Sequence, residues 1–199
     1  MSGARAWFPA GGMSPTQPLL VRTVLLFAAL LLSVGVARAD TITVKSAELL
    51  AEEDDYVLNA QFDFAFNPTL EEALQKGVSL YFVLEFELAR PRWYWVDEKV
   101  AQLSVQYRLT YTPLTRQYRL TSGLLSQQLD SLEEVQRVLA RVVSRPVVAR
   151  DALTPGTRYI ASLRLRLDGT LLPKPFQVDA LASRDWTLQS EWYRWSFTP

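Results

Sequence analysis

Apolar and polar side chains alternate with a period of two residues along much of the chain. This pattern is typical of β-strands that have one buried face and one wet face. Because buried parallel strands carry continuous apolar runs instead, the alternation favours antiparallel sheets. Pro113 marks a turn after one run, so the strand before it and the strand after it are expected to form a hairpin. The predicted main strands are 56–66, 78–88, 101–111, 117–122 and 159–167.

Weaker strand patterns and two helices complete the predicted elements. In the first helix, Asn67 is the expected N-cap, Pro68 takes the first helical position and Gly77 follows the end. The second helix is expected to begin with a capping box of Asp130 and Glu133 and to run toward Pro146. The weaker strands are expected at Thr41–Leu50, Val147–Arg150, Phe176–Leu181 and Leu188–Phe197.

Short strands with few helices predict a mainly β fold, an antiparallel immunoglobulin-like β-sandwich with two short added helices. The segment Leu153–Tyr159 resembles the corner between strands E and F of fibronectin type III domains. That resemblance implies that the Tyr159 hydroxyl bonds to backbone upstream of it. Residues 40–199 are expected to form this sandwich as a single domain.

The N-terminal segment has the order of a cleavable secretory signal. Arg22 precedes the apolar run 24–36, and small residues precede Asp40 at the −3 and −1 positions. We therefore expect a signal peptide over residues 1–39, cleavage between Ala39 and Asp40, and a periplasmic product, with Met13 as a possible true start. An uncleaved anchor is the alternative, but spanning a bilayer takes roughly 20 apolar residues, and the run 24–36 is well short of that length. The mature form is expected to have no membrane span.

Composition narrows the chemistry that the mature chain can perform. The sequence has no Cys and no His, which excludes disulfides, His-based catalytic triads and the usual zinc and copper sites. Removing the three arginines of the signal leaves 18 basic and 21 acidic residues, a balance that does not favour nucleic acid. No nucleophile elbow or glycine-rich phosphate loop occurs. We expect no enzyme activity, metal or cofactor.

The segment 90–95 is the most unusual in the sequence, because two arginines and three large aromatic residues surround a proline. Aromatic rings beside guanidinium groups can grip a partner's loop or a ligand. The expected partner- or ligand-binding residues are therefore Arg92, Trp93, Tyr94 and Trp95. The alternative is that these tryptophans belong to the core together with Trp192 and Trp195.

Residues 40–199 resemble a family of exported proteobacterial proteins of unknown function. The resemblance rests on Arg90–Trp95, on Tyr107–Tyr111, on Leu172-Pro173 and on the tryptophans near the C-terminus. Members of that family tend to be encoded beside a membrane sensor kinase. The resemblance thus implies envelope sensing or signalling, with an envelope protein such as that kinase as the partner.

A glycan-directed protein is the rival interpretation, either a carbohydrate-binding module or a weak hydrolase. Glu85 and Glu87 stand two residues apart on one strand face, and glycoside hydrolysis needs a pair of carboxylates. Acidic residues on the wet face of a strand usually pair with cross-strand bases, and Arg164 and Arg166 are available for this. A non-enzymatic interaction module is therefore the favoured function.

Overall fold

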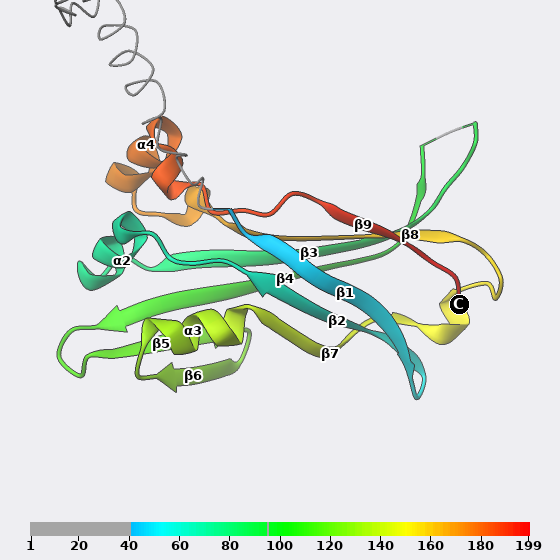
Figure 1. Ribbon diagram of the computed structural model, residues 1–199, viewed down its shortest axis with the longest axis horizontal. Coiled ribbons are helices and arrows are strands. Elements are labelled where there is room, and N and C mark those ends of the chain that lie inside the picture. The colour runs from blue at the N-terminus through cyan, green and yellow to red at the C-terminus, as the bar shows by residue number, and fades with distance from the viewer. Residues whose placement is uncertain (1–40, 95) are drawn as a thin grey trace, which may run out of the picture. The chain divides into compact units, whose positions relative to one another are not determined.

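The computed structural model describes residues 41–94 and 96–199, except for the side chains of 179–182. This part of the chain is mainly β, with two antiparallel sheets (Figure 1). The predicted cleavage site, Ala39 and Asp40, lies outside the described residues. Within the described residues, no helix has the length and apolar character needed to cross a bilayer.

The smaller sheet has three strands in the order β1-β2-β7: β1 (Thr43–Glu52), β2 (Asp55–Asp63) and β7 (Arg141–Ala149). Its central strand β2 alternates as the sequence predicts, with Leu58, Ala60 and Phe62 buried. The edge strand β7 contains two register shifts against β2 and a positive φ of 44° at Ser144.

The larger sheet has six strands in the order β6-β5-β4-β3-β8-β9. Strand β3 lies between β4 and β8, and its register pairs Glu85 with Ser104 on one side and with Arg164 on the other. The strands are β3 (Leu80–Arg90), β4 (Glu98–Thr112), β5 (Gln117–Ser122), β6 (Leu125–Leu129), β8 (Tyr159–Leu167) and β9 (Tyr193–Phe197). All neighbouring strands are antiparallel, as the alternation predicts.

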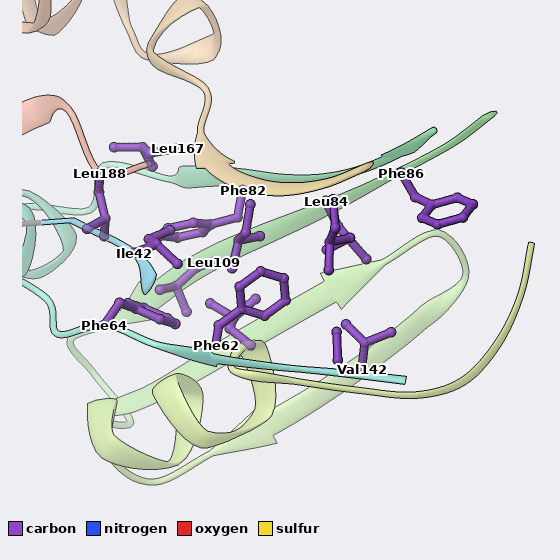
Figure 2. Packing of buried hydrophobic residues seen from close by; sticks show 14 of the residues in the cluster. Ile42, Phe62, Phe64, Phe82, Leu84, Phe86, Leu109, Val142, Leu167 and Leu188 are labelled. Atoms are coloured by element: carbon purple, nitrogen blue, oxygen red, sulfur yellow. The ribbon is translucent and has the colours of Figure 1, made fainter. Parts of the chain in front are cut away.

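A single hydrophobic cluster lies between the inner faces of the two sheets (Figure 2). Phe62 and Val142 come from the smaller sheet, whereas Phe82, Leu84 and Phe86 come from β3. Among the described residues, the members of this cluster run from Ile42 to Phe197. Burial of this apolar surface is the main stabilising term of a fold without disulfides.

Three α-helices occur in the described residues rather than the two predicted: α2 (Pro68–Gln75), α3 (Leu132–Leu139) and α4 (Lys174–Ala182). Asn67 caps α2 as predicted, since its Oδ1 accepts from the Leu70 N–H at 2.9 Å. Its Nδ2 also donates to the carbonyl of Asp185 at 2.7 Å. Asp185 belongs to a short 3-10 helix, η3 (Arg184–Trp186), so Asn67 connects α2 to a segment distant in sequence.

Three features of the sequence prediction were wrong around the later helices. The strand expected at Phe176–Leu181 is part of α4, where Pro175 sits in the first turn, a position that needs no N–H donor. The N-cap of α3 is Ser131 rather than Asp130, and the helix ends at Leu139 instead of continuing toward Pro146.

Pro146 lies within β7, because an edge strand needs ladder hydrogen bonds on one side only. The chain predicted as the end of a helix is thus a strand. A further strand, β6, was not predicted; four of its five residues are exposed, so it lacks an alternating burial pattern.

The corner before β8 has the geometry that its sequence resemblance implies. The Tyr159 hydroxyl accepts a hydrogen bond from the Thr154 N–H at 3.0 Å, five residues upstream. The Tyr159 ring is buried, with 2% of its surface exposed. The corner therefore joins the turn before β8 to the core.

Candidate interaction site

The loop of residues 91–97, here called the aromatic loop, connects β3 to β4 and projects from the larger sheet (Figure 1). The strand ladder closes at the pair Arg90 and Glu98, and the described residues between them take no part in sheet pairing. Pro91 comes directly after the last paired residue and cannot donate to a ladder. The sequence therefore ends the strand pairing at this point, and Arg92, Trp93 and Tyr94 beyond Pro91 are exposed.

An ion-pair cluster fixes the base of the aromatic loop. Arg90 Nε donates to Glu98 Oε2 at 2.9 Å, and Arg92 Nη2 lies 2.6 Å from the same oxygen. These bonds, first from Arg90 and then from Arg92, hold the pKa of Glu98 below its ordinary value. The Arg92 N–H also donates to Asp97 Oδ1 at 3.3 Å across the loop. The carboxylate is therefore charged at neutral pH, and the two sides of the loop stay joined.

The tip of the loop presents apolar side chains to solvent. Trp93 is 94% exposed, Tyr94 66% and Val96 78%. The Trp93 and Tyr94 rings contact each other edge to face, with centroids 5.0 Å apart and planes at 72°. Large rings exposed together in this way form an anchor that a partner can bury.

The predicted binding residues therefore separate into two groups. Arg92, Trp93 and Tyr94 lie together in the aromatic loop, while Trp95 lies outside the described residues. The core interpretation is wrong for Trp93. It holds in part for Trp195, which is half-buried against Phe86 at a centroid distance of 6.3 Å.

Sequence reasoning missed two parts of this site. Val96 extends the apolar tip, although no periodic pattern distinguishes it. The ion pair of Arg90 with Glu98 stabilises the base of the aromatic loop. The opposite charges of these two residues, on either side of the loop, were the sequence signal that could have predicted the pair.

The two acidic residues of the glycan hypothesis lie on the outer face of the larger sheet, where bases bind them. Arg164 Nε donates to Glu85 Oε2 at 2.8 Å, and Arg166 binds the other oxygen of Glu85 at 3.2 Å. Partial burial raises the pKa of Glu85, but these bonds outweigh it and the pKa is lowered. Glu87 accepts from Lys99 Nζ at 2.8 Å. A glycosidase acid needs a raised pKa, so this geometry does not favour Glu85 in that role.

A cavity of about 310 Å³ lies at the opposite end of the larger sheet from the aromatic loop. Its lining includes Asp168, Gln177 and Trp186. The end of β8 beside it pairs with the start of β3, whereas the loop follows the end of β3. Among the described residues, no three acidic side chains converge to form a metal site.

Comparison with known proteins places the chain in a family without assigning it an activity. Residues 39–196 match the domain of unknown function DUF4390, which covers most of the chain, and the protein belongs to that family. No curated protein matches the sequence, and no solved structure matches the fold.

Proposed function

We propose that this DUF4390 protein is an exported, non-enzymatic binding module that docks an envelope protein through the aromatic loop. The observation that carries this proposal is the exposure of Trp93. Its side chain is 94% exposed, and it stands on a loop whose base is held by ion pairs. Tryptophan is enriched among the few residues that dominate binding energy at interfaces. A base already held in place reduces the conformational entropy lost on binding.

The compartment and the partner class come from the sequence. The apolar run at 24–36, followed by Ala37-x-Ala39, supports export and processing to a periplasmic product. The family resemblance supports a membrane signalling protein as the partner, with a sensor kinase as the first candidate. In this arrangement the module acts as a sensing or regulatory subunit on the periplasmic side.

The fold that we propose for the module is immunoglobulin-like. Strand order supports this assignment: if β1, β2, β3, β4, β7, β8 and β9 are labelled A, B, C, C′, E, F and G, the sheets read A-B-E and C′-C-F-G. The hairpin of β5 and β6 then extends the second sheet beyond C′. The hydrogen bond of Tyr159 supports the same assignment at the E–F corner.

The non-enzymatic part of the proposal rests on the state of the acidic side chains. Both oxygens of Glu85 are bound by guanidinium groups and Glu87 is bound by Lys99. Their contacts are those of a cross-strand charge ladder, which stabilises a sheet face.

The test of the loop measures stability and binding on the same variants. Trp93→Ala should change the free energy of unfolding by less than about 0.5 kcal/mol, as is usual for an exposed side chain. It should weaken capture of the partner by about 2 kcal/mol or more, the range of an interface hot spot. Capture is measured by chemical crosslinking and pull-down of the exported protein from envelope fractions, compared band by band with wild type.

Leu114→Ala is the matched control, because Leu114 is also 93% exposed but lies in the turn between β4 and β5. It should capture every partner that wild type captures. If Trp93→Ala folds normally and captures those partners equally well, the loop has no role in binding and the proposal fails.

A further inference from the structure

The outer face of the larger sheet has an uneven charge distribution. Along each strand, the side chains that alternate with the buried ones point outward. The register of β3, β4, β5, β8 and β9 places these outward side chains on one face of the sheet. Three acidic groups on this face, Glu85, Glu87 and Asp168, are matched by ion pairs with three bases. Four more bases complete the face: Arg108, Arg119, Arg158 and Arg194.

These four residues, here called the arginine row, are exposed and form no ion pair among the described residues. Arg108 and Arg158 contact neutral groups. Arg158 Nη2 donates to Ser196 Oγ at 2.8 Å, and the Arg108 guanidinium lies 5.9 Å from the centre of the Tyr81 ring. The charge of the arginine row is therefore presented to solvent rather than neutralised within the fold.

The remainder of the domain carries the opposite charge. Residues 41–199 contain 18 basic and 20 acidic side chains, a net charge of −2. With Asp130, which accepts from Gln117 on the same face, the outer face has seven bases and four acids, a net charge of +3, so the rest of the domain carries −5. Such segregation creates a field that draws anionic surfaces toward one side of a protein.

The arrangement of the arginine row indicates which kind of anionic surface it fits. Its members come from β5, β4, the start of β8 and β9, so across the sheet they span four strand intervals, about 19 Å at normal spacing. Along the strands, Arg119 lies near the start of β3 and Arg158 near its end. A small anion or a short acidic peptide requires bases that converge on one point. Bases spread across a sheet instead meet a surface whose negative charge is also spread out.

We propose that the outer face of the larger sheet docks on an anionic phospholipid bilayer through the arginine row. Each base near such a surface favours binding by roughly fivefold, so four unpaired arginines are enough for reversible attachment. This inference concerns a second surface and stands independently of the aromatic loop. Attachment by this face would keep the domain beside a membrane-resident partner.

The test uses the chain 40–199, the mature form that the sequence predicts, because the apolar run at 24–36 would bind lipid by itself. Binding is measured by flotation with phosphatidylcholine vesicles that contain or lack phosphatidylglycerol. We expect binding only to the anionic vesicles, with a steep loss as salt is raised. Replacing Arg108 and Arg119 together by Gln should weaken binding about 25-fold.

A matched pair of substitutions controls for net charge. Arg137→Gln with Arg141→Gln removes the same charge from α3 and β7, both outside the larger sheet, and should leave binding within about twofold of wild type. Arg158→Gln with Arg194→Gln tests the other side of the row and should weaken binding as much as the first pair. All variants are checked for an unchanged unfolding midpoint.

Three results would overturn the proposal. The first is equal binding to neutral and anionic vesicles, and the second is equal loss in the control pair. The third is tighter binding to duplex DNA than to anionic vesicles, which would assign the face to nucleic acid. Loss of partner capture by Trp93→Ala with vesicle binding intact would show that the two surfaces act separately.

Discussion

Removing the Tyr159 hydroxyl isolates a single hydrogen bond at the corner before β8. The hydroxyl accepts from the Thr154 N–H at 3.0 Å, while the ring is 98% removed from solvent. Tyr159→Phe therefore keeps the packing and leaves the amide without this partner. A neutral hydrogen bond contributes about 1 kcal/mol net, so the free energy of unfolding should fall by that amount. Tyr159→Ala also removes the ring and should cost about 3–5 kcal/mol.

Urea unfolding of the chain 40–199, followed by tryptophan fluorescence, measures these costs. For Tyr159→Phe the midpoint should fall at constant m, with a melting temperature about 2–4 °C lower. Tyr94→Phe is the control, because Tyr94 is 66% exposed at the loop tip, and it should match wild type. If Tyr159→Phe unfolds at the wild-type midpoint, the hydroxyl contributes nothing and the corner no longer supports an immunoglobulin-like assignment.

Three further predictions concern other parts of the chain. Asn67→Ala loses the cap of α2 and the bond to Asp185, so the same urea titration should show a loss of about 2 kcal/mol. Partial burial raises the pKa of Glu85, but its bonds to two arginines lower it by more, so the folded-state pKa is below the unfolded-state value. The ion pairs of Glu85 should therefore stabilise the fold fully above about pH 4.3, and this contribution should disappear as the pH falls through the folded-state pKa. In Glu85→Gln, the free energy of unfolding, measured by urea titration at several pH values, should fall less steeply at acidic pH than in wild type. Intact mass of the exported protein should place the mature N-terminus at Asp40, after Ala39; a retained apolar run would contradict cleavage.

The main strands could be predicted because their burial pattern is local. In β3, Leu84 and Phe86 face the core on either side of the outward Glu85, and this alternation is visible in the sequence. The first helix was equally clear, since Asn67 and Pro68 give its start by local chemistry alone.

Elements whose state depends on distant neighbours could not be predicted. Pro146 is compatible with a strand only because β7 is an edge, and that follows from its pairing with β2, far away in sequence. Strand β6 is exposed on most of its length and pairs only with β5, so its residues carry no apolar period.

The sequence indicated where the candidate site lies, but it did not predict which of its side chains are exposed. Trp93 and Trp195 have the same side chain, yet the first is almost fully exposed and the second packs against Phe86. The difference arises because β3 and β4 stop pairing at Arg90 and Glu98, whereas the partner of Trp195 is Ala161 in β8. Residue type alone does not contain this information.

The pairing of β3 with β8 has a consequence for the order of folding. Glu85 and Arg164 are neighbours in the sheet but stand 79 residues apart in the chain. Strand β2 likewise pairs with β7, which comes much later in the sequence. Contacts that close such long loops slow folding, into the millisecond-to-second range typical of all-β domains. Neither sheet can be completed until most of the chain has been synthesised, so a chain that ends before Tyr159 should remain open. Such a delay keeps the core open during synthesis, and under the export proposed above it would let the chain cross a membrane before the core closes.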